Sequence, residues 1–188
     1  LNKTKVNDLS PIRNLTKLKV LWLDQTEVSD LSPIRNLTGL QGLWLEKTEV
    51  SDLSPIRDLT GLQSLWLDKT GVSDLSPIRD LIGLQSLLLD QTGVSDLSPI
   101  RNLTGLRVLQ FTRTRVSDLR HLINMGELGD GSYGGLWFSD TPAVQNDPEL
   151  AQLAKIDNDV IRAKETIAYL KTLPPWPEPL PWLAPDPE

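Results

Sequence analysis

The stretch LTGLQSLWLDKTGVSDLSPIRD at residues 59–80 recurs almost unchanged along most of the chain. The copies follow one another every 22 residues, as is seen from Pro11, Pro33, Pro55, Pro77 and Pro99. A fixed period of roughly 20–50 residues is the signature of a solenoid, in which each unit buries its apolar face only by stacking on its neighbours. The sequence therefore predicts a fold made of stacked repeats.

Each repeat contains one short strand. In LWL at 65–67 the two leucines point to one side and the tryptophan to the other, because side chains alternate along a strand. The strands are expected in one parallel sheet, near residues 20–23, 42–45, 64–67, 86–89 and 108–111, with a weaker one near 136–138. The sixth copy, LWFSDTPAV at 136–144, comes five residues late. The loop before it, GELGDGSYGG at 126–135, is therefore expected to hold an insertion of five residues.

The sequence SPIR is expected to form a cap on the far side of each repeat from the strand. Its serine is a candidate helix N-cap, and the following proline suits the first helical position. These serines are Ser10, Ser32, Ser54, Ser76 and Ser98. Val28, Leu31, Ile34 and Leu37, with their equivalents, are expected to fill the interior. The chain opens in phase with the repeat, and this predicts further repeats upstream.

The repeat core LxxLxLxxTxV begins at Leu18, Leu40, Leu62, Leu84 and Leu106. It resembles the leucine-rich repeat of the 22-residue class and is most similar to the bacterial internalin type. The resemblance covers residues 1–144, and it implies a curved α/β solenoid with a parallel sheet on its concave face. It also implies that the concave face grips another protein. Threonine replaces the asparagine that bonds turn backbone in the family, at Thr4, Thr26, Thr48, Thr70, Thr92, Thr114 and Thr141.

The period stops after Val144, and residues 145–173 are expected to form a helical cap. Asp147, Pro148 and Glu149 are typical of a helix start, and this helix is expected to run to about Ile156. A second helix is expected to begin near residue 157 or 158. Its apolar stripe is Val160, Ala163, Ile167, Leu170 and Leu173. Both helices are interpreted as covering the open end of the solenoid; the alternative is a helix offered to a partner.

Residues 174–188 form a proline-rich tail, and prolines in such number favour an extended polyproline II conformation. Three interpretations stay open for it. It is a linker to another domain, a strap packed on its own or a neighbouring solenoid through Trp176 and Trp182, or a proline-rich ligand for another protein.

The composition argues against several classes of function. A net charge of −6 disfavours nucleic acid and anionic membrane surfaces as partners. The chain has no cysteine, so thiolate metal sites are excluded and the cell compartment is left open. His121 is its only histidine and is interpreted as a plain surface residue, so no catalytic site is predicted. No metal site is predicted, because the sequence has no His-rich, paired-Cys or oxygen-loop spacing of metal ligands. No cofactor is predicted, because GDGSYGG at 129–135 lacks the lysine of a phosphate-binding loop.

The concave face is the predicted binding surface. Between the two leucines of each strand lie Trp22, Trp44, Trp66, Leu88, Gln110 and Trp137. Adjacent strands are about 4.8 Å apart, so the first three tryptophans are expected to form a contiguous strip. Beside them runs an acidic column, Asp24, Glu46, Asp68 and Asp90. Trp22, Trp44, Trp66, Leu88, Trp137 and the four acids are therefore the predicted site for a protein or peptide, preferably one with Lys or Arg.

Other interpretations of these columns stay open. The tryptophans can be a ladder that only stiffens the sheet, or a by-product of repeat duplication. The face can also bind carbohydrate, since sugars stack on tryptophan, or the repeats can be a structural or sensory segment of a larger protein. On the opposite edge runs an arginine column, Arg13, Arg35, Arg57, Arg79 and Arg101. It is interpreted as a surface whose charges are compensated rather than as an anion-binding stripe.

Overall fold

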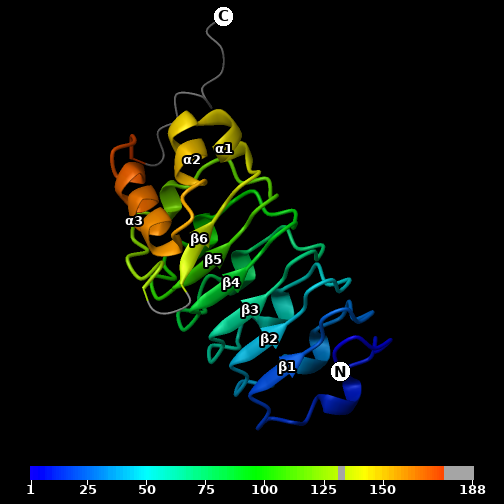
Figure 1. Cartoon of the computed structure of the whole chain (residues 1–188). Coiled ribbons are helices and arrows are strands. Elements are labelled where there is room, and N and C mark those ends of the chain that lie inside the picture. The colour runs from blue at the N-terminus through cyan, green and yellow to red at the C-terminus, as the bar shows by residue number, and fades with distance from the viewer. Residues whose placement is uncertain (131–133, 176–188) are drawn as a thin grey trace, which may run out of the picture.

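The computed structural model describes residues 1–130 and 134–175, and it has one parallel sheet (Figure 1). Its strands are β1 Val20–Trp22, β2 Gly42–Trp44, β3 Ser64–Trp66, β4 Ser86–Leu88, β5 Val108–Gln110 and β6 Gly135–Trp137. They follow one another in chain order, each in register with the next. Val108 pairs with Gly135, 27 residues on, whereas the other pairs are 22 apart. The predicted strands, their parallel order and the insertion before β6 are all confirmed.

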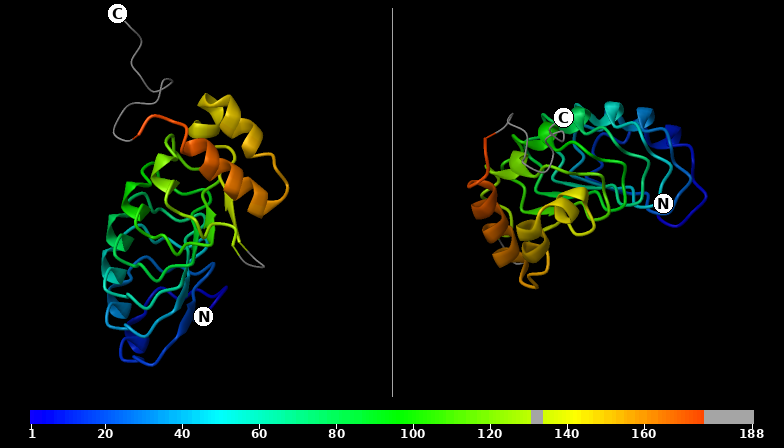
Figure 2. Two further views of the ribbon diagram at one scale, coloured as in Figure 1. Left: turned by 90° about the vertical axis from the view of Figure 1, so that its left-hand side faces the viewer. Right: turned by 90° about the horizontal axis from the view of Figure 1, so that it is seen from above.

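The far side of each repeat is a single turn of 3-10 helix. Figure 2 shows these turns along one side of the coil and the strands along the other. They are η1 Ser10–Ile12, η2 Ser32–Ile34, η3 Ser54–Ile56, η4 Ser76–Ile78, η5 Ser98–Ile100 and η6 Arg120–Leu122. Together with the sheet they give the curved leucine-rich-repeat solenoid that the sequence predicts.

The predicted role of the cap serines is wrong. No serine side chain caps these turns, and each serine is instead the first residue of its turn. The aspartate two positions earlier accepts the serine N–H, for example at 2.8 Å from Ser10 to Asp8 and from Ser32 to Asp30. An aspartate side chain readily closes such a turn on the backbone two residues on, so it takes the role assigned to serine.

The positions expected to fill the interior do so, and Val28, Leu31, Ile34 and Leu37 are at most 1% exposed. The threonines that replace asparagine close their own turn. Thr26 Oγ1 donates to Leu23 O at 2.6 Å, and Thr48 Oγ1 donates to Leu45 O at 2.8 Å. A threonine hydroxyl has a shorter reach than an asparagine amide, and it finds a carbonyl three residues back within the same repeat.

Three helices follow the last strand. They are α1 Pro142–Asn146, α2 Pro148–Leu153 and α3 Asp159–Leu170. Asp147 and Asn158 cap α2 and α3 through their side chains, as the sequence suggests. The predicted end of α2 near Ile156 is three residues too late, and α1 was not predicted. Within the described residues, no helix is long and apolar enough to span a membrane.

The helices pack on the end of the solenoid. Ile167 and Leu170 of α3 are buried, Val160 is half-buried, and α3 lies against β6 (Figures 1 and 2). Tyr169 Oη donates to Asp147 Oδ2 at 2.7 Å and so ties α3 to the start of α2. The division into a solenoid, a cap and a tail stays a prediction. The strap through Trp176 and Trp182 lies outside the described residues.

Candidate functional site

The three tryptophans Trp22, Trp44 and Trp66 are contiguous on the concave face. Their ring centroids lie 5.6 Å apart between Trp22 and Trp44 and 5.3 Å apart between Trp44 and Trp66. The rings meet edge to face, at 74° and 76°, rather than face to face. Edge-to-face pairs place the positive rim of one ring against the negative face of the next, which favours them over a flat stack. We call these three residues the tryptophan row.

Gly42 determines how the middle ring sits. A Cβ built on Gly42 would lie 2.3 Å from Cζ3 and 2.4 Å from Cη2 of Trp44, so the indole occupies the space above this glycine. At β2 the glycine lets the ring lean back on its own strand, which leaves Trp44 half-buried. Trp22, on the outermost strand of the sheet, is 54% exposed.

The acidic column has a structural role that the sequence did not reveal. Asp24 Oδ1 accepts the N–H of Glu46 at 2.9 Å, and Asp68 Oδ1 accepts the N–H of Asp90 at 2.7 Å. Asp90 does the same for Thr112 at 2.7 Å. Each of these aspartates therefore fastens its repeat to the next one through the main chain. These aspartates therefore stabilise the stacking of the repeats as well as carrying surface charge.

Burial also changes the acidity of the column. It raises the pKa of Asp24 and raises the pKa of Asp68 to about 6, against the lowering effect of the backbone hydrogen bonds. Glu46 lies between them and pairs with Lys47 at 3.2 Å and with Lys69 at 3.5 Å. The column is therefore acidic but partly neutralised by its own lysines.

Replacing Asp68 by asparagine is expected to stabilise the protein near neutral pH. The amide oxygen can still accept the Asp90 N–H, while the cost of a half-buried charge disappears. Because the pKa is raised on folding, stability is lost as the pH rises from about 4 through 6, and only the wild type loses it. Discounted for partial exposure, the gain is about 1 kcal/mol above pH 7. Thermal melts from pH 4 to 8 measure it.

Asp30→Asn is the control with the opposite sign. Hydrogen bonds from Ser32 lower the pKa of Asp30, so its charged form supports the fold above the unfolded-state pKa. This variant is expected to melt lower than wild type at neutral pH, with the difference vanishing in acid. If Asp68→Asn also melts lower at neutral pH, the carboxylate of Asp68 is a net stabilising group and the account of its burial is wrong.

The tryptophan row does not continue along the whole sheet. Leu88 and Gln110 take the next two positions, and Gln110 Nε2 donates to Asp90 Oδ2. Trp137 on β6 is separated from the row by these residues and lies under α3. The guanidinium carbon of Arg162 is 5.2 Å from the centroid of the Trp137 ring. The structure therefore brings together Trp22, Trp44 and Trp66 but sets Trp137 apart.

His121 is not a surface residue, which corrects the sequence interpretation. Only 8% of it is exposed, and burial lowers its pKa. Its neighbour Arg120 is also buried, is bound by both oxygens of Asp118, and donates through Nη1 to Pro174 O at 2.9 Å. Arg-His stands in η6 where the other repeats have Ser-Pro, so this cap is adapted to receive the chain after α3 rather than being a decayed copy.

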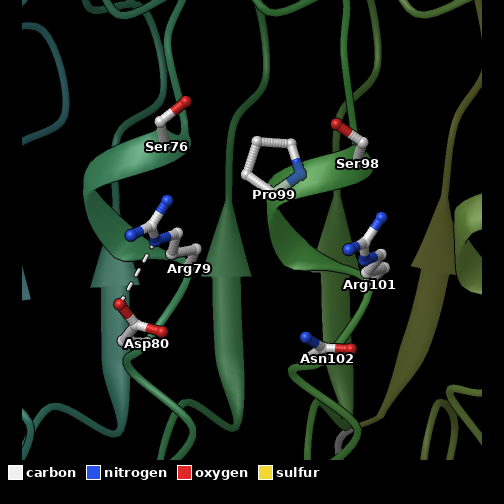
Figure 3. A pocket seen from close by; sticks show the side chains of 7 residues that line it. All are labelled: Ser76, Arg79, Asp80, Ser98, Pro99, Arg101 and Asn102. Atoms are coloured by element: carbon white, nitrogen blue, oxygen red, sulfur yellow. Dashed lines mark hydrogen bonds and ion pairs between the residues drawn. The ribbon is translucent and has the colours of Figure 1, made fainter.

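The convex side offers shallow hollows between successive 3-10 turns. One of them is lined by residues of η4, η5 and the segments that follow, with Arg79 and Arg101 facing it (Figure 3). Arg79 Nε pairs with Asp80 Oδ2 at 3.3 Å, and both side chains are well exposed. Among the described residues, no group of three or more His, Cys, Asp or Glu could hold a metal ion.

Several solved structures are similar to the chain. Internalin C2 from Listeria monocytogenes has 30% sequence identity and a TM-score of 0.71, over 76% of this chain and 61% of that one. Internalin F from the same organism has 28% identity and a TM-score of 0.64, over 75% and 47%. A leucine-rich-repeat protein from Leptospira interrogans has a TM-score of 0.70 over 90% and 39%; at 20% identity it supports the fold alone.

The chain thus spans less than two thirds of the length of each of these proteins. No protein-family model and no curated protein sequence matches it. Leucine-rich-repeat proteins generally serve as binding modules rather than enzymes, and the sheet, the 3-10 turns and the repeat motif are those of that fold. The chain has the leucine-rich-repeat fold, and its repeats are similar to those of the internalins.

Proposed function

We propose that the concave face binds a protein or peptide segment bearing a cationic side chain. The observation that carries the proposal is the tryptophan row, three contiguous indoles of which the first is more than half exposed. Soluble proteins rarely leave such apolar patches uncovered without a use, and tryptophan is enriched at the centres of binding interfaces. The proposed contact residues are Trp22, Trp44, Trp66, Leu88, Asp24, Glu46, Asp68 and Asp90.

The charge beside the row supports a cationic ligand. The carboxylates of the acidic column stand next to the aromatic rings, so a Lys or Arg side chain can face a ring and a carboxylate together. Lys47 and Lys69 weaken this field, and the preference is accordingly moderate. Trp137 was predicted as part of the same surface, but it already carries Arg162 and belongs to the contact with α3.

Selection of phage-displayed random peptides tests the proposal. Peptides selected on the wild type are expected to lose at least about 2 kcal/mol of binding, or roughly 30-fold in affinity, when Trp22, Trp44 and Trp66 are all changed to Ala. The matched control replaces Arg35, Arg57 and Arg79 of the same repeats by Ala on the opposite edge, and is expected to bind like wild type. All variants are compared by thermal melting first.

The outcomes separate the alternatives. Equal binding by the wild type and the tryptophan variant would remove the row from the site. A tryptophan variant that fails to fold would show that the row is a stiffening ladder, and Trp22→Ala alone, at the most exposed position, then reports on binding. A glycan array probed with the same proteins would show sugars, rather than peptides, bound in a tryptophan-dependent way if the face is a carbohydrate site.

A further inference from the structure

The chain contains an internal copy of the surface proposed to bind a ligand, and this copy is occupied. β2 and β6 have the same three residues, Gly-Leu-Trp, with the glycine and the tryptophan on the concave face. The first turn of α3 is seated over β6. Arg162 lies above the Trp137 ring, and Cβ of Asp159 lies 2.7 Å from where a Cβ on Gly135 would be. The contact shows what kind of group this tripeptide accepts.

Each guanidinium nitrogen of the arginine in this contact donates a hydrogen bond. Arg162 is only 6% exposed, and its Nε donates to Leu136 O at 2.7 Å. Its other nitrogens donate to Ile156 O and to Asp159 Oδ1. A guanidinium over an indole gains most when it is removed from water and its donors are paired, as here. The seat over β6 therefore combines a ring, a glycine gap and a carboxylate.

The equivalent surface on β2 has the same tripeptide and no described helix packed on it, but the ring of Trp44 itself fills the space above Gly42. Trp22 and Trp66 flank Trp44, whereas Gln110 is the residue beside Trp137. Glu46 stands two residues after Trp44, where β6 has Ser139. The carboxylate that α3 brings to β6 is thus already present on β2 as part of the solenoid.

Two differences between β2 and β6 determine how tightly a ligand is expected to bind at β2. The ring of Trp44 approaches the Cβ position of Gly42 to 2.3 Å, while that of Trp137 stays at 2.8 Å from the corresponding point on Gly135. Trp44 must therefore move slightly to admit a ligand. β6 is the last strand of the described sheet, and its Leu136 carbonyl is free to accept from Arg162, whereas β2 lies between two strands. A ligand at β2 relies on Glu46 instead and is expected to bind more weakly than α3 does.

We infer that the partner of the concave face presents an arginine from the first turn of a helix to Trp44, as α3 presents Arg162 to Trp137. The inference rests on the proposed function and names the chemistry of the ligand. Arginine fits better than lysine, because a planar guanidinium can lie on an indole while it pairs with a carboxylate. Glu46, two residues after Trp44, is the carboxylate proposed to pair with this arginine in place of Lys47 and Lys69. The first turn of the helix reaches Gly42 once the ring of Trp44 has moved aside.

The probe is a synthetic peptide of residues 157–172, DNDVIRAKETIAYLKT, held helical by a staple between positions 164 and 168, which are exposed in α3. A short free helix would be marginal in water. The intact protein is titrated with it while the indole N–H signals are followed by NMR. We expect the signal of Trp44 to shift, and the affinity to fall about tenfold when the peptide carries Arg162→Gln. Lys171→Gln in the peptide removes a charge elsewhere and is the matched control.

The protein variant Trp44→Ala is expected to abolish the titration, whereas Trp137→Ala is not, which distinguishes β2 from exchange with the protein's own α3. Equal affinity of the Arg and Gln peptides, or no binding of either, overturns the inference. The phage selection separates this failure from that of the proposed function. If the selected peptides need the tryptophan row for binding but carry no arginine, the arginine inference is wrong. The proposal that the concave face binds peptides would then still hold.

Discussion

A chain truncated after Val144 is expected to aggregate when it is expressed, instead of folding into a soluble solenoid. The last repeat buries Leu136 and Phe138 completely, and Ile167 and Leu170 are buried in the helices that the truncation removes. A solenoid without a terminal cap exposes its sectioned core to water and to other copies. Light scattering after size-exclusion chromatography, together with a thermal melt, measures the effect.

The matched control ends after Pro175, so that it keeps all three helices and the Pro174 carbonyl that Arg120 binds. This shorter chain is expected to melt like the full one. If truncation after Val144 also left the elution volume and the melting temperature unchanged, the helices would not be a cap, and the alternative of a helix offered to a partner would be favoured.

Replacing Arg162 by methionine is expected to cost about 3 kcal/mol of the free energy of unfolding. The methionine fills much of the same space, but the carbonyls of Leu136 and Ile156 lose their donor, and Trp137 loses the cation above it. For a chain of this size the loss corresponds to a fall of roughly 6–12 °C in the melting temperature. Calorimetry at neutral pH measures it.

Lys164→Met is the control, because Lys164 lies two residues further along α3 with an exposed side chain. Changes at such surface positions usually stay within about 0.5 kcal/mol. An Arg162 variant that melts like this control would mean that α3 is held by its apolar side chains alone. The contact with Trp137 would then lose its value as a guide to the ligand.

The solenoid was predictable because its signal is repeated. The period of 22 residues locates each strand to within a residue, and the late arrival of β6 could be counted directly from the sequence. The turn chemistry was less accessible, because Asp8 and Ser10 are both good capping residues and only geometry shows which one accepts the hydrogen bond. The first helix after β6, α1, is a single short segment without the periodicity that reveals α3.

The contiguity of the tryptophan row was predictable from the sequence, but its packing was not. Alternation along a strand is enough to place Trp22, Trp44 and Trp66 in one row. It does not show that Trp44 leans over Gly42, that Asp68 fastens the next repeat, or that Arg162 covers Trp137. The contacts of Asp68 and Arg162 join residues 22 or more apart, and the contact of Trp44 with Gly42 depends on the orientation of the ring; no local pattern encodes either. The burial of His121 was missed for the same reason.

The five-residue insertion before β6 also marks the C-terminal end of the regular repeats and so fixes their register. Five nearly identical units have a translational symmetry, so that shifting the chain by one whole unit would restore the same strand neighbours. Only an irregular end breaks this symmetry. The longer loop and the hydrogen bond from Arg162 to the Leu136 carbonyl distinguish the last repeat from the others. Repeats can therefore be gained or lost by duplication or deletion in the regular part of the solenoid. The last repeat still keeps its place next to the helices.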